Sequence, residues 1–394
     1  MDPVAIVGGG TSRFGVRNLT WRELVQEAGG RTFAELDTIL PKEIDTLVVG
    51  ASQPERFAFQ SYVAPLVAET LGMTPKNLLR TELACASGQM ALRTAWSFIA
   101  SGLTDLALVV GVEKMNLPNM AESQSSMACV LDREWDGVHG GTAPPFFAMC
   151  AQRHMHDHGT TVEQMAAVVE KNHHYSVYND SAHFQKEVPR DKVLRSPMVA
   201  PPLRLFDCSG ITDGAAIAVL ASAEVAKGLT DTPMWVHSWG QDNSGNRTGA
   251  LGDLAAWRSM RRASREAYRL AHIEPKDLDV AEIHDCFSIS EIIGYEQLGF
   301  CDEGKGGRFI DDGQSLIGGT IPINTRGGLL GCGHPLGATG IAQVVELHRT
   351  FKSAVPPQRQ VAGAELAMAH NLSGPANVHS VGIYGVDPPR GASA

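Results

Sequence analysis

The sequence TELACASGQMAL, residues 81–92, places a cysteine among small residues where a helix is predicted to begin. Apolar side chains at helical spacing follow over residues 90–99, so the helix should enter the core and direct its N-terminus at Cys85. A helix N-terminus stabilises a nearby anion by roughly 0.3–1 kcal/mol, up to about 2 kcal/mol when sheltered. This lowers a thiol pKa from about 8.5 to roughly 7–8. The stretch therefore predicts a nucleophilic Cys85 that still needs a basic partner, such as a histidine.

The other cysteines argue against a disulfide framework and against a metal site. Seven cysteines are scattered along the chain without a CxxC pair, which favours a reducing compartment. Most free cysteines are buried structural residues, and this alternative applies to Cys85 as well. The histidine-rich run 154–158 has no cysteine or carboxylate pair at ligand spacing nearby, so we predict no metal.

Composition indicates a globular protein of two domains or one large duplicated core. The chain has 394 residues, of which 43% are apolar and 19% charged. Its net charge is −10 and no block of like charges stands out, which argues against nucleic-acid binding through a basic face. The first residues lack the regions of a signal peptide and no apolar run reaches membrane length, so we expect a cytoplasmic protein without a membrane partner.

Apolar strands alternate with helices along the first half of the chain. A strand at 4–7 is expected to end in a glycine turn at 8–10, and further all-apolar strands are expected near 44–50 and 106–111. Amphipathic helices are predicted at 21–39 and 61–71. This alternation predicts a parallel-rich sheet covered on both faces, hence the α/β class.

The second half repeats a module of the first. PKEID at 41–45 returns as PKDLD at 275–279, each time after an amphipathic helix and before a strand. A duplicated core brings the strand ends of the two halves to one cleft. Between them, from about residue 113 to 205, clean strands are few, which indicates a layer inserted over the site.

Three segments of the second half are candidates for the cleft. HDCF, residues 284–287, follows the predicted strand 280–283. NTRGGLLGCGHPLGATG, residues 324–340, opens a helix that should run to about Phe351, and the glycines around His334 let the backbone approach a ligand closely. That setting makes His334 a candidate base. HNLSGP, residues 370–375, is expected to form another strand-end loop.

A cysteine at a small-residue helix mouth, HDCF and NxxGGxxxxGHPxGATG, in this order, resemble the thiolase superfamily along nearly the whole chain. HDCF replaces the NEAF of ordinary thiolases and HNLSG replaces their CxG, which is similar to archaeal acetoacetyl-CoA thiolases and sterol-carrier-protein-x thiolases. The resemblance implies a duplicated, five-layered αβαβα fold. Its N-terminal half would be 1–225, with a loop domain at about 113–205, and its C-terminal half 226–394.

The resemblance also implies roles for individual residues. Cys85 would accept the acyl group, His334 would activate it, and Cys286 would be the second acid/base. The side chains of His334 and His284 would form one oxyanion hole, and the backbone N–H groups of Cys85 and Gly374 a second. CoA thioesters would be the substrates, with no cofactor and no metal.

The implied reaction is that of an acetyl-CoA C-acetyltransferase, which joins two acetyl-CoA into acetoacetyl-CoA or runs in reverse. A 3-ketoacyl-CoA thiolase of longer chains, a retro-aldolase-type carbon–carbon lyase and a silent subunit of an acyltransferase complex are the alternatives. The lyases lack the nucleophile, so Cys85 argues against that alternative. The resemblance further implies a homodimer or homotetramer, a place in the mevalonate pathway, and a complex with HMG-CoA synthase on a zinc-binding OB-fold scaffold protein.

Overall fold

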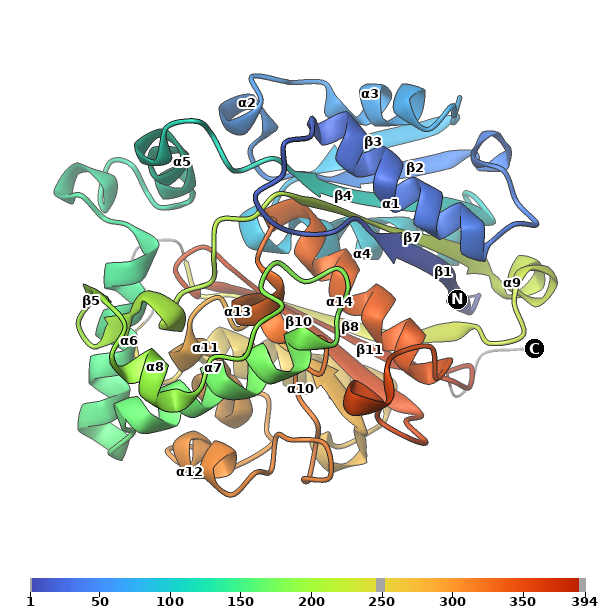
Figure 1. The fold of residues 1–394 in the computed structure, drawn as a ribbon. Coiled ribbons are helices and arrows are strands. Elements are labelled where there is room, and N and C mark those ends of the chain that lie inside the picture. The colour runs from blue at the N-terminus through green and yellow to red at the C-terminus, as the bar shows by residue number, and fades with distance from the viewer. Residues whose placement is uncertain (1, 246–251, 390–394) are drawn as a thin grey trace.

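Two half-sheets and three helical layers stack in the order αβαβα (Figure 1). The computed structural model describes residues 2–245 and 252–389. Within these ranges the strands are β1 (Val4–Thr11), β2 (Thr46–Gly50), β3 (Asn77–Thr81), β4 (Leu106–Glu113), β5 (Met198–Ala200), β6 (Leu203–Arg204), β7 (Gly214–Ser222), β8 (Met234–Asn243), β9 (Val280–Glu282), β10 (Leu366–Ser373) and β11 (Val378–Gly385). The α-helices there are α1 (Trp21–Glu35), α2 (Pro54–Phe57), α3 (Val63–Thr70), α4 (Ser87–Ala100), α5 (Met120–Met127), α6 (Ala143–His158), α7 (Val162–Val177), α8 (Arg190–Leu194), α9 (Ala223–Leu229), α10 (Arg258–Ala271), α11 (Ser288–Gln297), α12 (Gly306–Asp311), α13 (Gly328–Cys332) and α14 (Leu336–Phe351).

The layers follow from which helices contact which strands. Helices α1 and α3 cover the outer face of the N-terminal half-sheet, and α10 covers the outer face of the C-terminal one. Helices α4 and α14 pack on each other between the half-sheets. Strands β1, β2, β7 and β11 are buried along their whole length, because helices lie on both faces. The predicted five-layered α/β fold is confirmed.

Nine of the described strands form one mixed sheet in the order β3-β2-β4-β7-β1-β8-β11-β10-β9, and β5 and β6 form a separate two-stranded sheet. The half-sheets meet where β1 pairs with β8 through Ala5–Trp235 and Ile6–Met234. Only β2–β3, β2–β4 and β9–β10 are parallel neighbours among the described strands. The expected parallel-rich sheet is therefore wrong. An unbroken run of apolar residues indicates that both faces of a strand are buried. Helices on both sides of a sheet bury both faces of parallel and antiparallel strands alike.

Two expected loops lie inside strands. Strand β1 continues through the glycines at 8–10 to Thr11, so no turn ends it there. Glycine is needed for close packing instead, since a Cβ on Gly9 would lie 2.5 Å from the carbonyl oxygen of Ile217. His370 and Asn371 pair with β11, so the loop begins only after Ser373.

Residues 113–205 form helices α5 to α8 and the small β5–β6 hairpin, which Figure 1 shows beside the stacked layers. Helix α7 packs against α11, α12 and α13 and so reaches the loops of the second half. The boundaries of this insert, and the division of the chain at 225, stay predictions. Among the described helices, none has the length and apolarity to cross a bilayer.

Candidate active site

Cys85 lies in a short 3₁₀ turn, Ala84–Ala86, directly before α4, as the sequence predicts. The turn is held by Ser87, whose hydroxyl accepts from the Leu83 N–H (2.9 Å) and donates to the Ala84 carbonyl (2.7 Å). The Cys85 side chain is half-buried. Its sulfur is thus fixed at the mouth of the helix and not sealed in the core.

Cys85 of the first half meets two histidines of the second. The Cys85 sulfur and one ring nitrogen each of His284 and His334 all lie within 4.8 Å of one another. The two imidazole rings are nearly perpendicular, with centroids 4.8 Å apart. Three side chains that the sequence predicts for the site, from segments some two hundred residues apart, therefore lie together.

The hydrogen bonds of His334 identify its tautomer. The Thr339 hydroxyl donates to the Pro335 carbonyl (2.9 Å), so its oxygen accepts from His334 Nδ1 (2.7 Å). Nε2 therefore carries the lone pair, and it has no hydrogen-bond partner among the described residues. Burial lowers the pKa of His334 to about 3. The imidazole is neutral at physiological pH and is available to accept a proton.

The Cys85 thiol is protonated at rest, contrary to the helix-dipole expectation. Burial raises its pKa to about 12, with smaller rises from Glu113 and Glu82. The backbone N–H groups of Cys85 itself and of Gly374 lower the pKa but do not outweigh burial. The predicted pKa of 7–8 is wrong because it counted the dipole and left out desolvation.

Cys286 lies in the HDCF loop between β9 and α11 and is 6% exposed. Burial raises its pKa well above the ordinary thiol value, and a thiolate at Cys85 would raise it further. The two sulfurs are thus close enough to interact electrostatically. The Ser290 hydroxyl lies 4.0 Å from the Cys286 sulfur and is its only side-chain hydrogen-bonding neighbour among the described residues.

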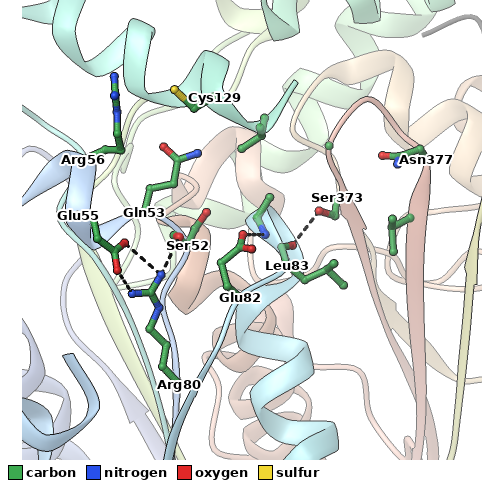
Figure 2. Close-up of a pocket in the computed structure, with 14 residues that line it drawn as sticks. Ser52, Gln53, Glu55, Arg56, Arg80, Glu82, Leu83, Cys129, Ser373 and Asn377 are labelled. Atoms are coloured by element: carbon green, nitrogen blue, oxygen red, sulfur yellow. Dashed lines mark hydrogen bonds and ion pairs between the residues drawn. The ribbon is translucent and has the colours of Figure 1, made fainter. Parts of the chain in front are cut away.

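Gly374 opens the turn between β10 and β11, with φ +60°. Its backbone N–H lowers the pKa of the Cys85 thiol, so it lies close to that sulfur. The preceding Ser373 hydroxyl donates to the Leu83 carbonyl (2.8 Å), which ties this turn to the Cys85 turn. Figure 2 shows this bond on the wall of a cavity of about 460 Å³, lined also by Arg80 and Glu82. An open path therefore leads to the two turns.

Comparison with known proteins identifies the arrangement. Residues 4–224 match the family described as thiolase, N-terminal domain, and residues 240–386 match thiolase C-terminal domain-like. The chain belongs to the thiolase family. It is 39% identical to an acetyl-CoA acetyltransferase of Methanothermobacter thermautotrophicus, over 98% of this chain and 100% of the relative. It is 32% identical to human sterol carrier protein 2, over 99% of this chain and 73% of that protein. The predicted resemblance and an acyltransferase activity are confirmed.

Solved structures share the fold. Human mitochondrial 3-ketoacyl-CoA thiolase superposes with a TM-score of 0.75 at 17% identity, over 98% of this thiolase and 99% of that chain. An Ltp2-ChsH2(DUF35) aldolase gives a TM-score of 0.81 at 23% identity, over 98% of both chains. At these identities the similarity concerns the fold alone.

A buried polar network holds the HDCF loop of this thiolase. Asp285 accepts from the Leu329 N–H (2.6 Å) and the Leu330 N–H (3.2 Å), and these bonds hold the loop in place. Asn172 of α7 donates to Asp285 and to Glu291, at 2.7 Å each. Asn172 has no motif around it, so nothing in the sequence points to its role.

Glu113, at the end of β4, is a second residue missed in the sequence. Its buried carboxylate accepts from the backbone N–H groups of Ser52 (2.8 Å), Gln53 (3.1 Å) and Gly337 (3.0 Å). Burial raises its pKa to about 7. The carboxylate joins the first half to the turn of α14 that follows His334. A lone acid at the end of an apolar strand was the signal available in the sequence.

A chain of buried histidines joins the two walls of the site. The backbone N–H of His284 points at His370 Nδ1 (3.4 Å). Nε2 of His370 contacts Nδ1 of His379 (3.1 Å), and Nε2 of His379 contacts the Ala376 carbonyl oxygen (3.0 Å). A carbonyl oxygen can only accept a hydrogen bond, so every N–H in this series of hydrogen bonds points toward Ala376. Burial lowers the pKa of His370 well below its usual value and that of His379 to about 4. The chain links the His284 loop to the turn that begins at Gly374.

Proposed function

We propose that this thiolase is an acetyl-CoA C-acetyltransferase, which condenses two acetyl-CoA into acetoacetyl-CoA or cleaves acetoacetyl-CoA with CoA. The observation that carries the proposal is the cluster of Cys85, His334 and His284 donor atoms within 4.8 Å. The 39% identity to a relative named acetyl-CoA acetyltransferase supports acetyl as the acyl group.

In the first step the Cys85 sulfur attacks the thioester carbonyl while its proton moves to Nε2 of His334. The negative charge that develops on the carbonyl oxygen is stabilised by the N–H groups of Cys85 and Gly374. The carbon–sulfur bond to CoA breaks, and the departing CoA thiolate takes the proton of Cys286. Acetyl-Cys85, a Cys286 thiolate and a protonated His334 result.

In the second step the Cys286 thiolate takes a proton from the methyl group of a second acetyl-CoA. The side chains of His334 and His284 hold the enolate oxygen. The enolate carbon attacks acetyl-Cys85 and expels its thiolate, which takes the proton from His334. The protons therefore balance over one cycle, and the raised pKa of Cys286 makes its thiolate a stronger base for the second step.

Intact-mass measurement after incubation with acetyl-CoA tests the proposal. We expect one acetyl adduct on the wild type, none on Cys85→Ala, and an unchanged adduct on Cys301→Ser, whose cysteine is also half-buried. Acetoacetyl-CoA should form with the wild type and with Cys301→Ser. A wild type that forms no adduct but cleaves a β-hydroxyacyl-CoA would instead support the lyase, and a wild type without either reaction would support the silent subunit.

We also propose that the protein is a homo-oligomer. Strand β3 lies at one edge of the sheet and all five of its residues are only half-buried. Phe59 and Tyr62, in the same half, are 91% and 77% exposed. Light scattering should give a multiple of the chain mass, and a monomer at micromolar concentration would contradict this. The cytoplasmic location, the place in the mevalonate pathway and the complex with HMG-CoA synthase and a scaffold protein stay predictions.

A further inference from the structure

The catalytic cluster contains buried ring nitrogens that lack hydrogen bonds. Neither Nδ1 nor Nε2 of His284 has a partner among the described residues, and the same holds for Nε2 of His334. His284 is 1% exposed and His334 5%. Buried polar atoms are nearly always hydrogen-bonded, so three unsatisfied ring nitrogens beside one thiol indicate that the cluster is built to receive a ligand.

These donors also match the requirements of a borderline-soft metal ion. In a tetrahedral Zn²⁺ site, Zn–S bonds of about 2.3 Å and Zn–N bonds of about 2.0–2.1 Å separate the donor atoms by roughly 3.3–3.6 Å. The sulfur and nitrogens here lie within 4.8 Å. They must therefore approach each other by at most roughly 1.2–1.5 Å. A rotation of His284 can supply this, because neither of its ring nitrogens is tied.

We infer that Cys85, His284 and His334 form a latent zinc site and that a zinc ion bound there inhibits the enzyme. The S–H bond of Cys85 breaks, its proton leaves to solvent, and a sulfur–zinc bond forms. Two imidazole nitrogens and a water molecule complete the tetrahedron. The metal engages the nucleophile and its base together, so no acyl group can be accepted.

The surroundings of the cluster favour this site over the histidine-rich segment. The Thr339 hydroxyl holds Nδ1 of His334, which leaves Nε2 directed at the metal position, as second-sphere hydrogen bonds commonly do in metal sites. In the segment 154–158, both ring nitrogens of His154 are already engaged, by Thr160 (2.7 Å) and by Glu296 (3.2 Å). His154 therefore has no free donor atom for an ion.

Metal titration of the full-length protein tests the inference without reference to its substrate. Metal-free enzyme is mixed with ZnCl₂ and the bound zinc is counted by mass spectrometry, and CoCl₂ replaces zinc to give an absorption band for sulfur-to-cobalt charge transfer. We expect one metal ion per chain and the cobalt band in the wild type and in two controls, Cys301→Ser and His156→Gln. Cys85→Ser should lose the band, and Thr339→Val should bind zinc about 10–100-fold more weakly.

Activity supplies a second readout. Zinc should abolish turnover over the same concentration range in which it binds, a chelator should restore turnover, and acetylation of Cys85 should prevent binding. A wild type without stoichiometric uptake or without the cobalt band overturns the inference, and so does uptake that is unchanged in Cys85→Ser. The wild-type cobalt spectrum decides the matter even if a variant fails to fold. Failure of the metal test leaves the acetyl-adduct test unaffected, so the two proposals are separable.

Discussion

The Cys85 turn and the Cys286 loop present two cysteines to one site, but they surround them differently. Cys85 is half-buried, and two backbone N–H groups, its own and that of Gly374, lower the pKa of its thiol. Cys286 is 6% exposed, and the nearest hydroxyl, that of Ser290, is 4.0 Å from its sulfur. Burial raises the pKa of both thiols. Backbone N–H groups from two separate turns lower the pKa of Cys85, whereas Cys286 has only its own backbone N–H and the Ser290 hydroxyl among the described residues. We therefore infer that Cys85 forms the covalent bond and that Cys286 carries a proton.

Removal of the Cys85 sulfur is the strongest test of this difference. Cys85→Ala should lose thiolysis of acetoacetyl-CoA by roughly 10⁴–10⁶-fold, because loss of a nucleophile removes the covalent route entirely. Steady-state release of acetyl-CoA measures the loss. If the variant kept more than a hundredth of wild-type turnover, the nucleophile would have to lie elsewhere.

Removal of the Cys286 sulfur should separate the two steps. Cys286→Ala is expected to accept an acetyl group on Cys85 but to lose condensation by a factor on the order of 10²–10⁴, the contribution of a positioned acid/base. Intact mass and turnover are measured on the same preparation. If Cys286 is instead only a structural cysteine beneath Phe287, Cys286→Ala should have lower thermal stability and turnover within a few-fold of wild type.

Loss of the Thr339 hydroxyl should weaken both steps, since both use His334. Thr339→Val keeps the side-chain volume but removes the hydrogen-bond partner of His334 Nδ1, and a misplaced base can lower the rate about 10²-fold. We expect kcat to fall about 10–100-fold with little change in KM. Thr339→Ser, which restores the hydroxyl, should recover most of the rate. Equal losses in the two variants would show that packing, and not the hydrogen bond, matters at this position.

The smallest predicted effect concerns the histidine chain that ties the two regions together. Burial lowers the pKa of His379 to about 4, so between pH 6.5 and 4 the unfolded chain binds a proton that the folded chain does not. The free energy of unfolding should therefore fall on acidification through this window, by at most about 3 kcal/mol for this residue. His379→Gln does not titrate, and its denaturation midpoint should decline less steeply over the same range. Parallel pH profiles would contradict the lowered pKa.

The sequence indicates which side chains meet at the candidate site, because their signals are local. Small residues before an apolar helix pointed to Cys85, and glycines around a histidine pointed to His334. Sequence reasoning failed where packing decides. The glycines at 8–10 continue strand β1 and serve close packing, because a Cβ on Gly9 would meet β7 and a Cβ on Gly8 or Gly10 would meet Leu36 or helix α1. His370 lies within β10, since its backbone pairs with β11.

The supporting residues were harder to foresee. Glu113 acts through the Gly337 N–H, which lies far away in the sequence. His379 acts through His370, which only the pairing of β10 with β11 brings beside it. The pKa of Cys85 was misjudged for the same reason, because desolvation depends on everything packed around the sulfur. Such effects become visible only when the two halves are placed together.

Deuterium exchange tests most directly the claim that the two cysteines act in separate steps. With acetyl-CoA in D₂O, the wild type should incorporate deuterium into the methyl group, since the Cys286 thiolate removes a methyl proton reversibly once Cys85 is acetylated. Cys286→Ala should form the acetyl-enzyme and yet leave the methyl group unlabelled. Labelling by Cys286→Ala at the wild-type rate would show that another group removes the proton, and the division of labour between the two cysteines would be wrong.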